Sequence, residues 1–133
     1  MIVLDEQVAD PRIIHRIERW YKGKVIRIID VRPRTAVPDD AIEVLLRQLS
    51  SPTFVTINHR HFWRKIPASL DYCVICLKLP AERSLELPDV LRAVLSRPEW
   101  RTKRGRLGAV IFVSDHRIAY YSAKQGHIEL ITN

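Results

Sequence analysis

The sequence has no long apolar run. Among its 133 residues, no stretch approaches the roughly 20 consecutive apolar residues that a membrane-spanning helix needs. The chain reaches Asp5 and Glu6 directly after Ile2, Val3 and Leu4, too soon for the apolar region of a secretory signal. Low-complexity stretches and internal repeats are also missing. We therefore expect a folded, soluble protein without an export signal.

Cysteine is scarce as well. The two cysteines, Cys73 and Cys76, lie in the apolar run DYCVICLKL, which has the character of a strand. Residues three apart in a strand point to opposite faces of a sheet, whereas redox and zinc CxxC motifs lie on turns. An inert buried pair in a reducing cytoplasm is the favoured interpretation, and a redox or metal role is the less favoured one.

Acidic residues are fewer than basic ones. The chain has 15 Asp and Glu against 22 Lys and Arg, for a formal net charge of +7 at pH 7. The excess is concentrated in RPEWRTKRGR at 97–106, a helical turn or a basic loop, and the other basic positions are Arg60, Arg64, Lys65, Arg12, Arg16 and Arg19. Such groups support contacts with nucleic-acid phosphates, but they are as common on solvated protein faces.

Strand-like and helix-like segments alternate, which predicts an α/β fold in a single domain over residues 1–133. Asp10 and Pro11 mark the start of a first helix that Gly23 closes. We expect strands at 1–6, 25–31, 53–58 and 72–79, helices at 11–21, 38–49 and 87–95, and a β-hairpin at 108–122 with an edge strand at 127–132. This order indicates a mainly parallel central sheet flanked by helices, with a C-terminal β-hairpin.

Polar side chains follow three of the predicted strands. Asp5 and Glu6 end the first, Asp30 ends the second and Asn58 ends the third, while Asp39 and Asp40 open the second helix. The carboxyl ends of parallel strands share one edge of a sheet, so these groups are expected to converge. Clustered carboxylates need a neutralising cation, and Mg²⁺ or Mn²⁺ suits an all-oxygen site. On a basic protein, this combination favours metal-assisted hydrolysis of phosphodiester bonds.

Each acid also has a structural explanation. Asp39 and Asp40 are natural helix caps, and Asp30 is as easily explained by a turn or by an ion pair with Arg32 or Arg34. Glu6 points to the opposite face from Asp5 by strand alternation. Asp5 is the most informative acid, because an unpaired carboxylate in a central strand is costly without a function.

Taken in order, the segments LDE, IIDVRP, PDDAI, TFVTINHRHF, CVICLKL and GAVIFVSDHRIAYY resemble short bacterial PIN-like domains, which are related to PIN-domain ribonuclease toxins. The resemblance runs from Met1 to about Tyr121. It implies a small α/β fold, a Mg²⁺ or Mn²⁺ site, RNA cleavage and, as often in this family, an antitoxin protein as a partner. It also implies that Asp5, Glu6, Asp30 and Asp39 or Asp40 stand where the family has its acids.

The third-strand segment departs from the family pattern. Relatives have Thr, one residue and then Asp, with a second Asp just before Phe. Here Thr56 and Phe62 match, but Asn58 and His61 replace the two acids. Asn58 still offers a neutral oxygen, whereas His61 suits a softer ion such as Mn²⁺ or Zn²⁺, a proton transfer, a phosphate contact or a plain surface role.

Three hypotheses follow. The first is a toxin-type, metal-dependent ribonuclease whose ion is held by Asp5, Asp39 or Asp40, and Asn58, with His61 as a further catalytic candidate. Its RNA-binding residues are expected to be Arg60, Arg64, Lys65, Arg101, Lys103 and Arg104. The second is a catalytically attenuated PIN-like scaffold that binds RNA or a protein partner. The third is a zinc protein built on His59 and His61.

Two further features stay open at the level of sequence. Trp63 and Trp100 could stack on RNA bases, although core packing is the more frequent use of tryptophan. The oligomeric state is also open, with a homodimer as one alternative to a monomer.

Overall fold

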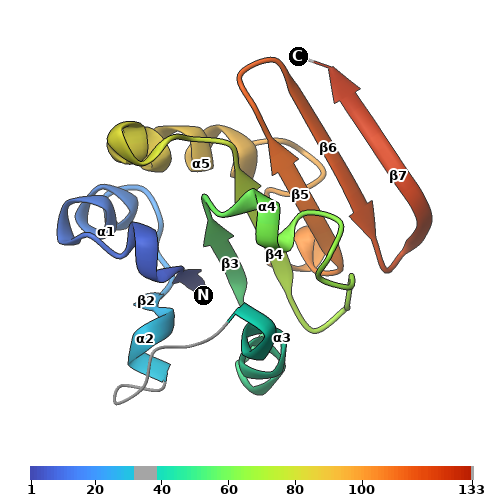
Figure 1. Cartoon of the computed structure of the whole chain (residues 1–133), viewed down its shortest axis with the longest axis horizontal. Coiled ribbons are helices and arrows are strands. Elements are labelled where there is room, and N and C mark those ends of the chain that lie inside the picture. Colours follow the sequence, from blue (N-terminus) through green and yellow to red (C-terminus); the bar gives the residue numbers. More distant parts are fainter. Residues whose placement is uncertain (32–38, 133) are drawn as a thin grey trace.

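A seven-stranded sheet forms the centre of the protein (Figure 1). The computed structural model describes the backbone of residues 1–31 and 39–132, and the side chains of residues 1–31 and 41–124. The strand order is β2-β1-β3-β4-β5-β6-β7. The strands are β1 (Ile2–Leu4), β2 (Val25–Arg27), β3 (Thr53–Thr56), β4 (Cys73–Leu77), β5 (Ala109–Val113), β6 (Arg117–Ser122) and β7 (Gln125–Thr132).

The sheet is parallel from β2 to β5 and antiparallel from β5 to β7. This arrangement confirms the α/β prediction of a mainly parallel sheet with a C-terminal hairpin. From β1 the chain moves to β2 on one side and then to β3 on the other. The switch point of the topology therefore lies between β1 and β3, and ligands of open α/β sheets bind at the carboxyl ends of such strands.

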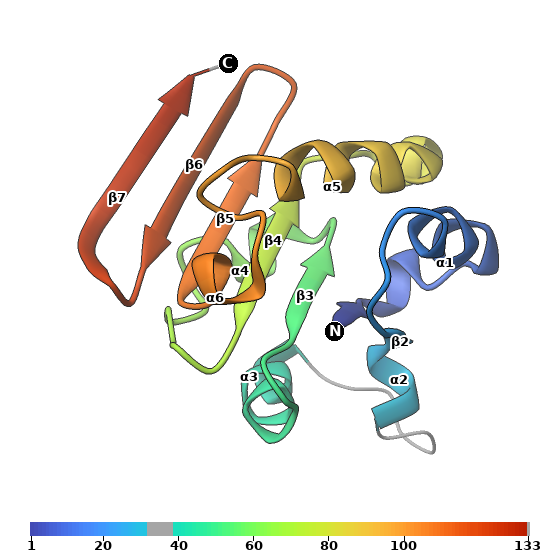
Figure 2. The same ribbon diagram turned by 180° about the vertical axis from the view of Figure 1, so that it is seen from behind.

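Helices cover both faces of the sheet (Figure 2). On one face, α1 (Pro11–Glu18) and α5 (Leu87–Leu95) bury Ile13, Ile17 and Leu91 against Leu4 and Ile75. The other face is packed against α2 (Ile28–Val31), α3 (Asp39–Gln48) and α4 (His59–Phe62). The short helices η1 (Glu6–Val8), η2 (Ala81–Glu86) and α6 (Lys103–Arg106) complete the described elements.

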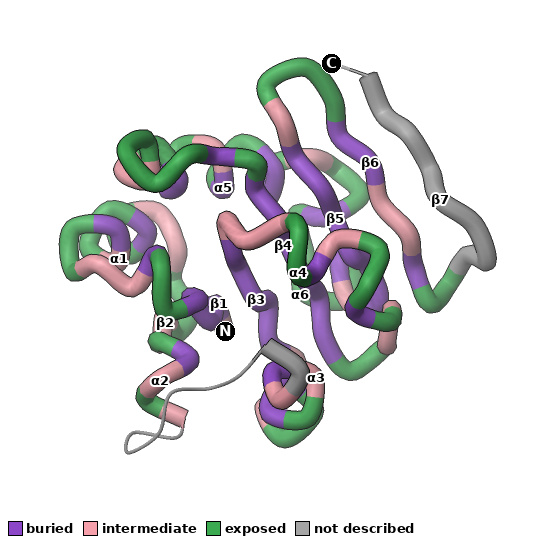
Figure 3. The backbone as a smooth tube through the Cα atoms, in the orientation of Figure 1, coloured by how far each residue is buried: buried purple, intermediate pink, exposed green. Residues whose placement is uncertain are grey.

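Burial follows this layered arrangement (Figure 3). Ile2, Val3 and Leu4 of β1 are fully buried, with Val3 on the face opposite to its two neighbours. A central strand covered on both faces is typical of a parallel sheet. Within the described residues, no helix is both long enough and apolar enough to cross a membrane.

The first helix begins as predicted but ends earlier. The Asp10 side chain accepts a hydrogen bond from the Arg12 backbone N–H at 2.8 Å, and Pro11 occupies the first turn. The helix ends at Glu18, so Gly23 is not its stop signal. By contrast, α5 has the predicted bounds of 87–95.

The second predicted strand, 25–31, is wrong beyond Arg27. Its last four residues form α2. This helix places the fully buried Ile28 in the core on the face of the sheet that α3 and α4 also cover. The β-branched run predicts a strand locally, but packing against the sheet outweighs that preference. Asp30 consequently lies on a helical turn rather than at a strand end.

Candidate anion-binding site at the carboxyl edge of the sheet

Asp5 lies at the end of β1 and is only 5% exposed. One carboxylate oxygen, Oδ2, accepts a hydrogen bond from the Thr56 hydroxyl at 2.6 Å. The other, Oδ1, accepts from the Glu6 backbone N–H at 2.8 Å and caps η1. A buried carboxylate is costly unless it is hydrogen-bonded, and these two donors offset that cost.

Thr56 extends this bonding to the loop that follows β3. Its hydroxyl oxygen accepts a hydrogen bond from the Asn58 backbone N–H at 2.9 Å while its proton is donated to Asp5. Phe62, at the end of α4, is 2% exposed and packs edge-on against Phe54 with ring centroids 5.4 Å apart. Thr56 and Phe62 thus hold the two ends of the segment that carries His59 and Arg60.

That segment forms one wall of a cavity of about 550 Å³. The other walls come from the end of β4 and the start of η2, and from the turn between β5 and β6. The cavity therefore lies at the carboxyl edge of the sheet. The polar residues that line it are Asn58, His59, Arg60, Lys78, Arg83, Ser114, Asp115 and His116.

The charge of this carboxyl-edge cavity is positive. Arg60, Lys78 and Arg83 line it against the single acid Asp115. Arg83 forms an ion pair with Glu86 at 2.7 Å and lies 3.7 Å from Asp115, whereas Arg60 and Lys78 have no ion-pair partner among the described residues. Two uncompensated cations at the mouth of a cavity favour an anionic ligand.

His59 adds a titratable group to the same wall. Burial lowers the pKa of its imidazole below the usual 6.5, and the positive charges of Lys78 and Arg60 lower it further. The ring lies 5.7 Å from that of Phe112 between centroids. His59 therefore favours its neutral form, and it would gain a proton most readily when an anion enters the cavity.

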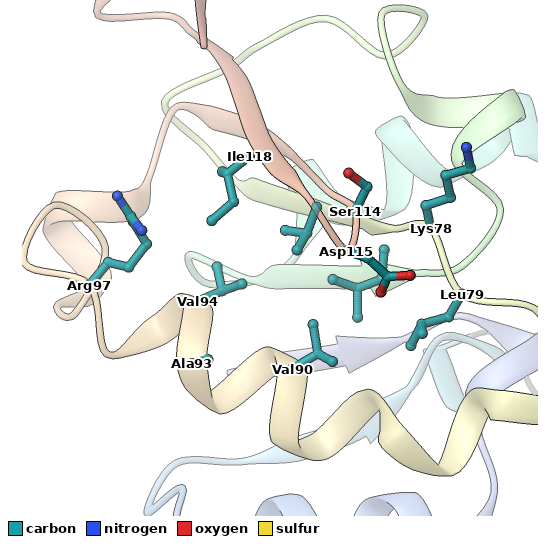
Figure 4. A pocket seen from close by; sticks show the side chains of 11 residues that line it. Lys78, Leu79, Val90, Ala93, Val94, Arg97, Ser114, Asp115 and Ile118 are labelled. Carbon is teal, nitrogen blue, oxygen red and sulfur yellow. The ribbon is translucent and has the colours of Figure 1, made fainter. Parts of the chain in front are cut away.

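A hollow of about 300 Å³ adjoins the cavity, and we call it the apolar hollow because most of its lining residues are aliphatic, although Arg97 lines it as well (Figure 4). Val90 and Val94 of α5 form its floor, and Leu79 and Ile118 close its sides. Lys78, Leu79, Ser114 and Asp115 line both spaces. The carboxyl edge thus carries a basic cavity and an apolar hollow with a common boundary.

Among the expected acids whose side chains the structure describes, Asp5, Glu6 and Asp30 do not line the carboxyl-edge cavity. Glu6 begins η1 and is exposed, which corrects the expectation that strand alternation orients it. Asp30 forms a bidentate ion pair with Arg27, at 2.9 and 2.8 Å, which lowers the pKa of its carboxyl group. The anticipated partners Arg32 and Arg34 lie outside the described residues, as do the side chains of Asp39 and Asp40.

The remaining donors do not make a metal centre by themselves. Within residues 1–31 and 41–124, no group of three or more His, Cys, Asp or Glu side chains could hold a metal ion. Both oxygens of Asp5 already accept hydrogen bonds from the protein. The side chains of Asp39 and Asp40 lie outside the described residues, so the Mg²⁺ or Mn²⁺ site that the PIN-like resemblance implies stays a prediction. His59 and His61 likewise form no zinc site with other described residues.

The predicted RNA-binding residues fall into separate regions. Arg60 lines the carboxyl-edge cavity, and Arg64 and Lys65 are exposed after α4. Arg101 and Lys103 line a cavity of about 510 Å³ beside Trp20 and Arg92. This second cavity lies near the starts of β1 and β5, so we call it the amino-edge cavity. Arg104 is exposed beside it, and its carbonyl oxygen accepts a hydrogen bond from Lys124 at 3.1 Å.

Arg106 shows that the basic cluster at 97–106 also has a structural part. Its side chain is 4% exposed, and its guanidinium donates to the Thr53 hydroxyl at 2.9 Å and to the Trp100 carbonyl at 3.2 Å. These bonds tie α6 to the start of β3. Nothing in the run of charges distinguishes Arg106 from its neighbours, so the sequence alone could not identify it.

The tryptophans and cysteines are used for packing. Trp100 is 2% exposed and packs edge-on against Tyr120, while the Trp63 ring contacts those of Phe112 and Tyr121. Cys73 and Cys76 are free, fully buried and on opposite faces of the sheet, as predicted. Burial raises the pKa of the Cys73 thiol to about 12, so its thiolate is strongly disfavoured.

Lys78, Arg83 and His116 are functional candidates that sequence reasoning missed. They lie in separate segments, and only the packing of β4, η2 and the β5–β6 turn brings them to Arg60. Comparison of the chain with protein-family models, with curated proteins and with solved structures gave no match. The PIN-like resemblance stays a prediction.

Proposed function

We propose that this protein binds RNA and that the carboxyl-edge cavity receives phosphate groups of the RNA backbone. The observation that carries the proposal is the convergence of Arg60, Lys78 and Arg83 from three segments on one open cavity. Arg60 and Lys78 have no described acidic partner, so their charge is available to a ligand. Phosphate contacts by such side chains supply most of the affinity in sequence-independent binding of nucleic acids.

The surroundings of the cavity support an extended polyanion. The chain has a formal net charge of +7, and the amino-edge cavity adds Arg92, Arg101 and Lys103. Neutral donors also line the carboxyl-edge cavity, among them Asn58 and Ser114. The Asp5–Thr56 hydrogen bond serves this function indirectly, because it positions the turn that precedes Arg60.

The test is equilibrium binding of a labelled single-stranded RNA, followed by fluorescence anisotropy at several salt concentrations. Replacing Arg60 and Lys78 together by Ala should weaken binding by about tenfold or more and lower the salt slope by about 1.4. The control is Arg47→Ala, which removes one positive charge from α3, outside the cavity, together with an ion pair to Glu43. Equal affinity in the double variant and the native protein would contradict the proposal.

A metal-dependent ribonuclease of toxin type is the second candidate. It is favoured by the position of Asp5 at the end of β1, beside the end of β3 and the switch point of the sheet. Cleavage of RNA in Mg²⁺ or Mn²⁺ that disappears in Asp5→Asn would support it. Cleavage that appears only after Asn58→Asp with His61→Asp would instead support a catalytically attenuated PIN-like scaffold, which is compatible with the proposed RNA binding.

A further inference from the structure

We infer that the apolar hollow beside the carboxyl-edge cavity seats the base of a single nucleotide whose phosphate lies in the cavity. The ligand class is a nucleoside monophosphate, free or as an unstacked residue of RNA. The inference rests on the proposed RNA binding but adds a base site to a phosphate site. It is carried by the common boundary between a cavity lined by Arg60 and Arg83 and a hollow in which most lining residues are aliphatic.

The hollow has the surface that a base requires. Val90 and Val94 of α5 and Ile118 of β6 present aliphatic side chains to the space between them (Figure 4). Its volume of about 300 Å³ is at the lower end of the range for small-molecule sites. An unstacked base can be held between apolar side chains that cover its ring faces, as in enzymes that flip bases out of a stack.

The charges give the ligand one orientation. Asp115 and Lys78 line both spaces and do not distinguish them, and Arg97, which lines the hollow, is paired with Glu99 at 2.5 Å. Arg60 and Arg83 line only the cavity, where they attract that phosphate. Ser114 also stands at the boundary. Its hydroxyl donates a hydrogen bond to the Arg117 carbonyl at 3.3 Å, whereas the Lys78 ammonium has no ion-pair partner among the described residues and can contact the phosphate. The base therefore enters the hollow and the phosphate stays on the basic side.

The first experiment compares three probes on the purified full chain by calorimetry: adenosine monophosphate, adenosine and inorganic phosphate. We expect the monophosphate to bind about tenfold more tightly than either fragment, because only it occupies both spaces. Equal affinities for the monophosphate and for inorganic phosphate would overturn the inference.

A substitution in the hollow separates the base site from the phosphate site. Val90→Phe fills the hollow from α5. It should weaken the binding of the monophosphate by at least about fivefold and leave the affinity for inorganic phosphate unchanged. The matched control is Val44→Phe, which adds the same side chain at a 57% exposed position of α3. Native affinity for the monophosphate in Val90→Phe would contradict the inference.

An NMR measurement on the unaltered protein covers the case in which Val90→Phe fails to fold. Nuclear Overhauser effects should connect the base protons of the bound monophosphate with the methyl groups of Val90, Val94 and Ile118. Their absence at saturating ligand would remove the base site. If RNA still binds through Arg60 and Lys78 in that case, the proposed function stands alone; if neither RNA nor phosphate binds, both proposals fall.

Discussion

The carboxyl and amino edges of the sheet both gather basic side chains, but they use them in different ways. At the carboxyl edge, Arg60 and Lys78 are exposed around an open cavity and have no described ion-pair partner. At the amino edge, Arg106 lies buried and bonds to Thr53 and to the Trp100 carbonyl. Burial and partners, rather than the density of charge along the sequence, separate a binding cation from a structural one.

The amino edge also concentrates positive charge around the chain terminus. The Met1 amino group donates a hydrogen bond to the Tyr21 hydroxyl at 2.8 Å. Burial lowers its pKa, and the charges of Arg106 and Lys103 lower it further. This edge therefore attracts anions as well, but part of its charge is already committed to holding α6 against β3.

The largest difference between the edges should appear in stability. Arg106→Ala should lower the free energy of unfolding by about 3 kcal/mol, because Thr53 and the Trp100 carbonyl lose a buried donor. Arg60→Ala should change the same quantity by less than about 0.5 kcal/mol. Urea unfolding followed by circular dichroism measures both values, and equal losses would remove the distinction.

Within the carboxyl edge, the Asp5–Thr56 pair should matter more for stability than the exposed cations do. Thr56→Val should lower the free energy of unfolding by about 2 kcal/mol, because Asp5 loses a donor and the Asn58 N–H loses an acceptor. Thr56→Ser keeps the hydroxyl and should recover most of that stability in the same urea titration. An unchanged free energy of unfolding in Thr56→Val would show that these hydrogen bonds contribute nothing to stability.

The edges should also differ in RNA affinity. Replacing Arg101 and Lys103 by Ala at the amino edge should weaken the binding of single-stranded RNA by about threefold. The same replacement of Arg60 and Lys78 should weaken it by about tenfold. The effect is smaller because the amino-edge charges lie outside the proposed phosphate site and act over distance through salt-screened attraction. A larger loss at the amino edge than at the carboxyl edge would reverse the comparison.

The smallest effect should be a pH dependence confined to the carboxyl edge. His59 has a pKa below 6.5, so it is neutral at pH 7 and gains a positive charge as the pH falls. RNA binding should therefore tighten by about twofold to threefold between pH 7.5 and pH 5.5, and His59→Gln should reduce this change. The lowered pKa of His59 also makes the free energy of unfolding depend on pH. The contribution of His59 is complete above pH 6.5 and is lost as the pH falls through its lowered pKa.

Local sequence patterns predicted the elements in which periodicity and capping agree. The α5 helix has its predicted bounds, and the β5–β6 hairpin and the split of Cys73 and Cys76 between two faces were also correct. The error at 25–31 has a physical cause, since the β-branched run favours a strand locally but residues 28–31 form a helical turn that packs against the sheet. Packing of Ile28 decided between the two.

The candidate site was predictable only in part. The sequence singled out Asp5 as a carboxylate at the end of an apolar strand, but it did not predict its donors, Thr56 and the Glu6 N–H. Lys78 and Arg83 carry no local signal, because each becomes relevant only when its segment lies beside α4. Their position depends on contacts between residues far apart in the chain.

By itself, the amino-acid sequence determined the layered α/β architecture, the excess of positive charge and the buried place of the cysteines. These properties follow from composition and from hydrophobic periodicity, which act along the chain. The tertiary structure alone decided which cations are buried and which stay exposed around a cavity, and it placed an apolar hollow beside Arg60 and Lys78. Those outcomes depend on how separate elements pack, and packing is a property of the whole fold.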